Sequence, residues 1–448
     1  MVEKKSLFGT SGIRGDAEKL FTEQFCFDMG RTYVEFLRKI SLLGPIAVGM
    51  DPRASSPRIK EAIFKGLATG GTQLFDEGVT PIASVNWIVK NTEATGGIMI
   101  TGSHISPELN GVKFYARDQE VTPEDESQIE EIYWDLKDKM KPSDENPKVV
   151  VETRAKDLYI ELLISLAKNP YPRWKVAVDC ANGAQSVVMP HLLRQLGLNV
   201  IEVNCDPQDE FIARDTDAED KARLEDIKKK VVEEKCDFGI AYDGDGDRVV
   251  FIDEKGNFVQ GEYSCGLVAK ESEGKKVVTT IAASQVVDYI GKDIVRVRVG
   301  SPYVTAKMRE VGASFGFEQN GGAVSAEIMY TRDGGGMTMK LLNIFSGFKG
   351  TFSEFIGQLP RFYMSRTKVD YRWELKEKIL KDAKEHFKGV KVDETDGLKI
   401  WIDETTWMLF RSSMNAPEFR VFAESKDKKT SERLLQEGID FVNNIIKE

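Results

Sequence analysis

Strand-like and helix-like segments alternate along most of this chain, and that alternation constrains its fold more than any other feature. "PIAVGMD" (45–51) is a short apolar run, and the helical pattern "SPRIKEAIFKGLATGG" (56–71) follows it. The same order returns around "KVAVDC" (175–180) and again around "KKVVTTIAAS" (275–284). Alternating strands and helices of this kind are typical of α/β units built on parallel or mixed sheets.

The pattern changes after residue 364. "GLKIWIDETTWMLFRSS" (397–413) and "PEFRVFAES" (417–425) have the composition of antiparallel strands. Two helical patterns, 374–387 and 431–447, flank them. Segregated strands and helices predict a separate α+β domain at the end of the chain.

The domain boundaries follow from length and from linker composition. A chain of 448 residues is too long for a single core. A turn-rich, charged stretch, "KMKPSDENPK" (139–148), ends the first unit, and a hairpin pattern, "RVVFIDEKGNFVQG" (248–261), marks the next boundary. We therefore expect three similar α/β domains with mixed sheets and one α+β domain, with the bounds 1–148, 149–253, 254–364 and 365–448.

Composition excludes several classes of protein. The net charge of -10 and the pI near 5.3 argue against general nucleic-acid binding but leave room for a local basic pocket. No stretch is apolar enough for a membrane span, and the N-terminus lacks the apolar core of a signal peptide. Five scattered cysteines without a CxxC pair indicate reduced thiols and a cytoplasmic location. Three histidines make a histidine-based metal cage improbable.

"AYDGDGDRVV" (241–250) predicts a metal site. Asp243, Asp245 and Asp247 alternate with glycines directly after an apolar strand, so three carboxylates can converge on one cation. Oxygen ligands alone favour Mg²⁺ or Ca²⁺ over zinc. An EF-hand is excluded because Arg248 stands where its loop needs glycine and because a β-branched strand follows. An acidic surface turn is the competing interpretation.

"TGSHISPELNGVK" (101–113) follows a strand that should end at Ile100. Ser103 and His104 would then lie at the carboxyl end of that strand, where α/β sheets bind ligands. In isolation a Ser-His pair in a loop is more often a turn than a nucleophile, and the GxSxG elbow of hydrolases is missing from this loop. This motif alone leaves both interpretations open.

Four further loops carry groups that suit phosphates or sugars. "FGTSGIRG" (8–15) places Arg14 among backbone N–H groups, and "DPRASSP" (51–57) places Arg53 before a helix. "FEQNGG" (317–322) suits sugar hydroxyls, and "FRSSMNAPEFRV" (410–421) offers a cluster of donors for a phosphate monoester. Ordinary turns, caps and solvated loops compete with each of these interpretations.

Taken together and in this order, the five phosphate, serine, metal and sugar motifs resemble those of the α-D-phosphohexomutases: phosphoglucomutase, phosphomannomutase and phosphoglucosamine mutase. Those enzymes carry GTxGxRG, a serine loop with NGxK, DGDxDR, GGExSGH and RxSxTEP. The resemblance extends over essentially the whole chain. It implies four domains around a central cleft. It also implies Mg²⁺ and an exchange of hexose 1- and 6-phosphates through a phosphoserine and a hexose 1,6-bisphosphate.

The resemblance also implies residue roles. Ser103 would carry the phosphoryl group and, as phosphoserine, would complete the metal site of Asp243, Asp245 and Asp247. Lys113 would act as acid and base, with His104 as an assistant, and Arg248 would approach the reacting phosphate. The expected substrate-binding residues are Thr10, Arg14, Arg53, Glu318, Asn320, Arg411, Ser413, Asn415 and Arg420.

Several departures from the family pattern leave the substrate open between a phosphorylated hexose and a phosphorylated hexosamine. Asn320 and Gly322 replace the usual serine and histidine of the sugar loop, and Ile105 replaces asparagine beside the serine. Asn415 and Ala416 replace the threonine and glutamate of the last loop, and Met50 stands in a frequent arginine position. A weakly catalytic sugar-phosphate sensor or scaffold and a hexose-bisphosphate-forming phosphotransferase are the alternatives. We expect no nucleic-acid or membrane partner, and a homodimer is left open.

Overall fold

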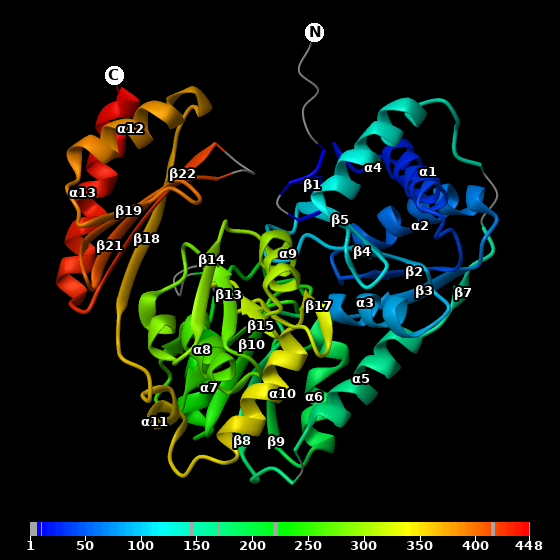
Figure 1. Cartoon of the computed structure of the whole chain (residues 1–448). Coiled ribbons are helices and arrows are strands. Elements are labelled where there is room, and N and C mark those ends of the chain that lie inside the picture. The colour runs from blue at the N-terminus through cyan, green and yellow to red at the C-terminus, as the bar shows by residue number, and fades with distance from the viewer. Residues whose placement is uncertain are drawn as a thin grey trace.

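The computed structural model describes residues 7–9, 11–143, 147–168, 170–217, 223–413 and 417–447. Figure 1 shows the N-terminal unit (blue to cyan) and the C-terminal unit (orange to red) on opposite sides, above the green and yellow middle of the chain. The architecture confirms the expected class, three α/β units with mixed sheets followed by an α+β unit.

The first unit has β2 at the centre of its sheet. β2 runs parallel to β3 and β4, and β5 returns antiparallel to β4. β4 ends at Ile100, so the serine loop starts at the carboxyl edge of the sheet, as predicted. The elements are β1 (Ile13–Asp16), α1 (Glu23–Lys39), β2 (Ile46–Met50), α2 (Ser56–Leu67), β3 (Leu74–Val79), α3 (Ile82–Asn91), β4 (Gly96–Ile100), β5 (Leu109–Ala116), β6 (Gln119–Glu120) and α4 (Pro123–Leu136).

The second unit has a five-stranded sheet in the order β12-β11-β10-β8-β9. β10 and β8 are parallel, whereas β11 turns back antiparallel to β10, so residues 243–248 form the turn between them. The helical composition of "AEDKARLEDIKKKVVEEK" (218–235) predicts a helix over this range, but 223 and 224 are not helical, α7 starts at Glu225, and 218–222 lie outside the described residues. β7 (Val150–Val151) pairs parallel with β3 and so belongs to the sheet of the first unit. The elements of the second unit are α5 (Arg154–Leu166), β8 (Lys175–Asp179), α6 (Met189–Gln195), β9 (Asn199–Val203), α7 (Glu225–Glu233), β10 (Phe238–Tyr242), β11 (Val249–Asp253) and β12 (Phe258–Val259).

The third unit shares its sheet with the first. β17 pairs with β6 through Tyr330 and Gln119, and this pairing joins the strands of both units into one twelve-stranded sheet. The elements are α8 (Gly261–Glu271), β13 (Lys276–Thr280), β14 (Asp293–Val297), α9 (Ser301–Val311), β15 (Phe315–Phe317), β16 (Ala323–Ser325), β17 (Met329–Arg332), α10 (Gly334–Phe345) and α11 (Phe352–Ile356).

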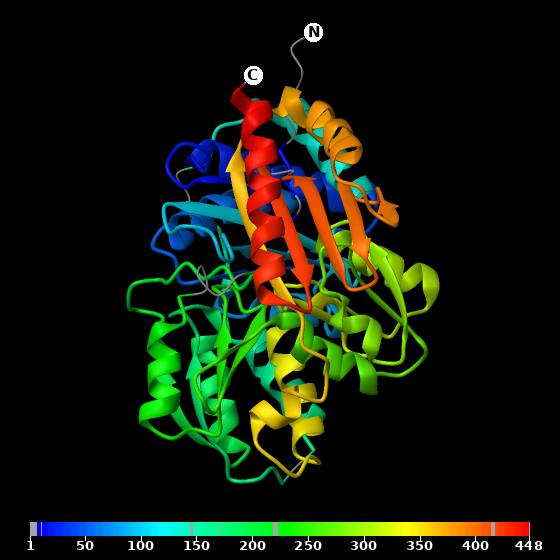
Figure 2. The same cartoon turned by 90° about the vertical axis from the view of Figure 1, so that its left-hand side faces the viewer.

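The C-terminal unit is an antiparallel sheet in the order β18-β22-β21-β20-β19 with two helices on one face. Figure 2 shows α13 lying along this sheet. The other face packs against the third unit, where Trp407, Leu409 and Phe422 contact Ile281 and Ala282. The elements are β18 (Tyr363–Asp370), α12 (Lys376–His386), β19 (Lys391–Asp393), β20 (Leu398–Asp403), β21 (Thr406–Ser412), β22 (Glu418–Ser425) and α13 (Lys428–Lys447).

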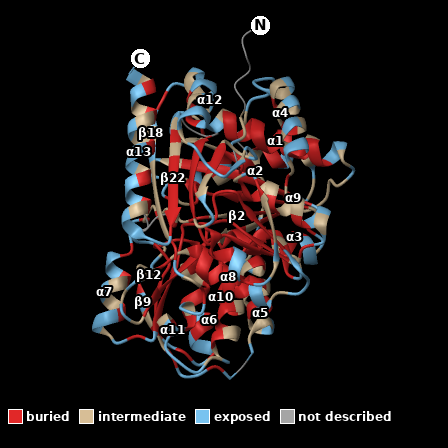
Figure 3. Ribbon diagram, turned by 60° about the vertical axis from the view of Figure 1, so that its left-hand side comes forward, coloured by how far each residue is buried: buried red, intermediate tan, exposed pale blue. Residues whose placement is uncertain are grey.

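Burial follows the layering of the α/β units. In Figure 3 the sheets are almost entirely buried, and the helices expose only their outward faces. Across the described residues, none of the helices is both long and apolar enough to cross a membrane.

Candidate active site

The serine loop and the aspartate loop meet although they come from different units. Ser103 Oγ donates a hydrogen bond of 2.8 Å to Asp243 Oδ2, and both side chains are buried. The approach depends on Gly244, because a Cβ there would lie 2.6 Å from the Ser103 carbonyl oxygen and 2.2 Å from Phe211 Cζ. The structure therefore brings the predicted serine and the predicted metal loop into direct contact.

The backbone of Ser103 is held in an uncommon conformation. Its φ of 54° lies in the left-handed region, and its N–H donates to Thr101 Oγ1 at 2.7 Å. His104 Nδ1 lies 3.4 Å from Ser103 Oγ. Burial, followed by the nearby charge of Arg248, lowers the pKa of His104 well below its usual value, so the ring is neutral at pH 7.

Arg53 supports the serine loop rather than an anion. Its Nε donates to Asp51, while Nη1 donates to the carbonyls of Ser106 and Leu109. Nη2 donates to the carbonyls of Ser103 and Ile105. All five guanidinium N–H groups are engaged in this way, which leaves none for the phosphate expected from its sequence position.

The three aspartates form a buried group that fits a divalent cation. One ligand oxygen from each lies within 4.8 Å of the others. Oδ1 of Asp245 and Oδ1 of Asp247 are buried and accept no hydrogen bond from any described residue. Burial, and then the charges of Asp245 and Asp247, raise the pKa of Asp243 to about 8. A divalent cation held by these three carboxylates would relieve this repulsion.

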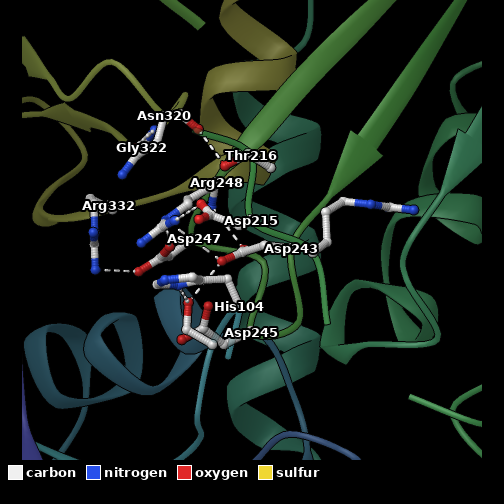
Figure 4. A network of polar contacts seen from close by, with 12 residues as sticks. His104, Asp215, Thr216, Asp243, Asp245, Asp247, Arg248, Asn320, Gly322 and Arg332 are labelled. Carbon is white, nitrogen blue, oxygen red and sulfur yellow. Dashed lines mark hydrogen bonds and ion pairs between the residues drawn. The ribbon is translucent and has the colours of Figure 1, made fainter. Parts of the chain in front are cut away.

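Cations from three segments surround the carboxylates. Lys113 Nζ lies 3.1 Å from Asp245 Oδ2 and 3.4 Å from Asp247 Oδ2. Arg248 Nε lies 3.7 Å from Asp243 and 3.6 Å from Asp247. Arg14 is close enough for Arg248 to lower its pKa, although burial lowers that pKa more. The result is a buried cluster of mixed charge, of which Figure 4 shows the aspartates and Arg248.

Sequence reasoning missed Arg332, the cation with the shortest contact to the metal loop. Its Nη2 lies 2.6 Å from Asp247 Oδ2, and its Nη1 donates to Glu318 Oε2 at 2.8 Å. The only signal in the sequence is an arginine in "YTRDGGG" (330–336), at the end of a strand and before a glycine-rich helix start.

The sugar loop contacts a second segment that the sequence did not single out. The Asn320 carbonyl accepts from Thr216 Oγ1 at 2.6 Å, and its side-chain oxygen accepts from the Gly322 N–H at 3.0 Å. Figure 4 shows Thr216 and Asp215 between this loop and Arg248. The sequence feature that could have pointed to this segment as part of the site is the pair of alternating aspartates in "RDTD" (214–217).

The strands on either side of the loop that was expected to bind phosphate, β21 and β22, carry two of the predicted arginines. Arg411 Nε donates to Asp396 at 2.5 Å, and Arg420 faces Arg411 across β21 and β22. Asp217 lies 3.6 Å from Arg366 Nη1. Burial opposes ionisation of Asp217, but Arg366, Arg420 and Arg248 together lower its pKa.

Two of the predicted binding residues, Thr10 and Asn415, lie outside the described residues, as does Ala416. Ser413 is buried at the end of β21, where its N–H donates to the Glu418 carbonyl at 2.8 Å. The structure places five of the predicted site residues next to the aspartates: Ser103, His104, Lys113, Arg14 and Arg248. A sixth, Glu318, is connected to them through Arg332.

Comparison with known proteins agrees with this arrangement. The models of phosphoglucomutase/phosphomannomutase α/β/α domains I, II and III match residues 5–140, 157–256 and 260–363. The chain therefore belongs to the phosphoglucomutase/phosphomannomutase family, the α-D-phosphohexomutases. Membership confirms the expected enzyme class, an isomerase that acts by phosphoryl transfer.

Individual relatives cover nearly the full chain. A phosphoglucomutase/phosphomannomutase of Thermococcus kodakarensis is 34% identical over 458 residues, which cover 98% of this chain and 99% of the relative. A probable phosphoglucosamine mutase of Methanopyrus kandleri is 31% identical, with 98% of each chain covered. The crystal structure of a phosphoglucomutase/phosphomannomutase family protein from Burkholderia thailandensis has the same fold. It superposes with a TM-score of 0.84 at 23% identity, over 99% of this chain and 98% of that one.

Proposed function

We propose that this protein is a Mg²⁺-dependent phosphohexomutase that interconverts hexose 1-phosphate and hexose 6-phosphate through phosphorylated Ser103 and a hexose 1,6-bisphosphate. The observation that carries the proposal is the contact of Ser103 Oγ with Asp243 in a buried site ringed by Lys113, Arg248 and Arg332. The Ser103 hydroxyl thus contacts a carboxylate of the group that would hold the metal, and the three cations contact carboxylates of the same group.

The charge around Ser103 suits phosphoryl transfer. Mg²⁺ bound at Asp243, Asp245 and Asp247 would disperse the negative charge of the transferring group. Arg248 and Arg14 add fixed positive charge from the protein. The sugar hydroxyl attacks the phosphoryl group on Ser103 in one half of the cycle, and Ser103 attacks the other phosphate of the bisphosphate in the second half.

Lys113 is our candidate for proton transfer. Its ammonium group is buried and held between Asp245 and Asp247. Lys113 would accept the proton of the attacking hydroxyl as the neutral amine in one direction, and as the ammonium it would return that proton to the leaving oxygen in the other. The neutral ring of His104, 3.4 Å from Ser103 Oγ, assists at the serine.

Two other loops would bind the rest of the substrate. One would bind the sugar, and the other would bind the phosphate that is not reacting. Glu318 and Asn320 would bind sugar hydroxyls, and Arg411, Ser413 and Arg420 would hold the distal phosphate. Thr10 and Asn415 remain predictions for the same tasks. Because Asn320 and Gly322 alter the sugar loop, we propose a phosphorylated hexose or hexosamine as the substrate without choosing between them.

Phosphorus NMR tests the function directly. The protein, Mg²⁺ and a trace of glucose 1,6-bisphosphate are given glucose 1-phosphate, mannose 1-phosphate or glucosamine 6-phosphate, and a new isomer signal is expected for at least one of them. Binding by calorimetry without any conversion would instead establish a sugar-phosphate sensor. Free bisphosphate in proportion to turnover would establish a bisphosphate-forming phosphotransferase.

Replacement of Ser103 by alanine tests the covalent step. We expect Ser103→Ala to carry no phosphate by mass spectrometry and to lose several orders of magnitude of mutase activity, because no other described hydroxyl lies within hydrogen-bond distance of Asp243. Full activity in this variant would contradict the phosphoserine assignment.

The domain bounds 1–148, 149–253, 254–364 and 365–448 and a central cleft between the domains stay proposals. So do the absence of nucleic-acid and membrane partners and a homodimer. Cytoplasmic location is also a proposal, which the five free thiols support.

A further inference from the structure

Arg332 joins two loops that come from different units of the fold. It is the last residue of β17, where it lies opposite Val324 of β16. Its buried guanidinium reaches Asp247 of the metal loop at 2.6 Å and Glu318 of the sugar loop at 2.8 Å. Figure 4 shows the side chain pointing at Asp247 from beside Gly322.

The side chain of Arg332 lies where a side chain at position 322 would lie. A Cβ built on Gly322 would be 2.7 Å from Arg332 Cδ and 3.4 Å from its Cγ. These atoms are in the middle of the arginine side chain, so a larger residue at position 322 would displace the whole guanidinium. Gly322 and the present position of Arg332 therefore depend on each other.

The backbone of Arg332 is fixed by its neighbour. The Asp333 N–H donates to the Ala323 carbonyl at 2.9 Å, and the Asp333 carboxylate caps α10 by accepting from the Gly336 N–H at 2.9 Å. Tyr159 of the second unit also donates to Asp333. These hydrogen bonds hold the backbone next to Arg332 in place, and a fixed backbone suits a residue that orients the side chains of Asp247 and Glu318.

We propose, on the basis of the mutase function above, that Arg332 is a positioning residue with two effects. Through Glu318 it fixes the carboxylate that binds a sugar hydroxyl, and through Asp247 it competes with the metal for one ligand. A planar guanidinium can donate to both carboxylates at once, whereas an ammonium group cannot match that fork.

Metal titration tests the competition without any turnover. Mn²⁺ is titrated by calorimetry into the Ser103→Ala protein and into the same protein with Arg332→Ala. Loss of the arginine should tighten Mn²⁺ binding about tenfold or more, since Asp247 is released and a positive charge is removed. Affinity within twofold of the parent, weaker affinity, or a parent that does not bind Mn²⁺ would overturn the proposal.

Gly322→Ala provides a second variant that keeps the charge. The added Cβ should push Arg332 away from Asp247 and tighten Mn²⁺ binding in the same direction. Gly347→Ala is the matched control, because a Cβ there would meet only the Ile344 carbonyl oxygen, at 3.5 Å. If Arg332→Ala does not fold, Gly322→Ala decides: an unchanged affinity would refute the competition.

Steady-state kinetics test the second effect, the positioning of Glu318 by Arg332. In the otherwise wild-type enzyme, Arg332→Lys should raise the KM for the sugar phosphate about tenfold and lower kcat much less, because Glu318 loses its fixed partner. An unchanged KM would refute this effect. If the wild-type enzyme converts no sugar phosphate, the mutase proposal fails, and the Mn²⁺ result still decides the competition for Asp247.

Discussion

The residues that carry the chemistry divide into those that the sequence reveals and those that it does not. Asp243, Asp245 and Asp247 are adjacent in the chain and follow a recognisable strand, so their convergence was predictable. Arg332 reaches them from another unit through a long side chain, and no local pattern encodes that reach. Arg53 looked like an anion site, but the carbonyls that it binds belong to a loop fifty residues away.

Lys113→Ala tests proton transfer at the residue scale. We expect kcat to fall by about two to four orders of magnitude, the range of a lost general acid or base. Mg²⁺ should still bind, since the variant removes a cation from Asp245 and Asp247 and leaves the carboxylates in place. Rate measurements with and without added small primary amines provide the check. An unchanged rate would move the proton role to His104.

At the scale of elements, patterns that are local in sequence were predicted well. β2, β4, β8, β10 and the hairpin of β11 and β12 lie where apolar runs and turns placed them. The start of α7 was wrong by several residues, because charged residues near 220 continue a helical composition that the structure does not follow at 223 and 224. The composition of 363–370 predicts no strand where β18 lies, since an edge strand of mixed burial lacks a continuous apolar run.

Thr122 followed by Pro123 is the sequence pattern of an N-cap and the first residue of a helix, and Thr122→Ala tests this boundary. Thr122 forms a capping box with Asp125 at the start of α4, where each side chain accepts from the backbone of the other. Its loss should lower the free energy of unfolding by about 1 kcal/mol without changing kcat. Denaturant titration measures the change, with Ser127→Ala, on the exposed side of the same helix, as the control.

At the scale of the whole molecule, the pairing of strands between units escaped prediction. The sheet shared by the first and third units depends on one pairing between short strands, β6 and β17, that are two hundred residues apart. Such a pairing leaves no periodic signal in either segment, because register between distant strands is set by packing and not by local composition. The division into α/β and α+β units was nevertheless correct, since each unit retains its own pattern of strands and helices.

The junction of the first and second units should respond to pH. Burial, followed by interaction with Glu152, raises the pKa of Glu77 to about 7, and Glu77 accepts from the Ala155 N–H at 2.8 Å. Between about pH 4.5 and pH 7 the folded protein then holds a proton that the unfolded chain has lost. Stability from this group is therefore present below about pH 4.5 and is lost as the pH rises to about 7.

Glu77→Gln should remove this pH dependence. The amide keeps an acceptor for Ala155 but cannot ionise, so the variant should gain stability of about 1–3 kcal/mol over the wild type at pH 7.5 and little at pH 4.5. Thermal unfolding at the two pH values is the measurement. Equal differences at both pH values would show that the pKa of Glu77 is the same in the folded and the unfolded chain.

The shared sheet also affects how the chain is made. The N-terminal unit leaves the ribosome with β6 at an open sheet edge, and the strand that completes it, β17, is synthesised some two hundred residues later. The second unit is synthesised in that interval and is an insertion between two parts of one sheet. β6 is only two residues long, Gln119 and Glu120. The sheet edge that is unpaired until β17 is made therefore offers few backbone groups for pairing with another nascent chain.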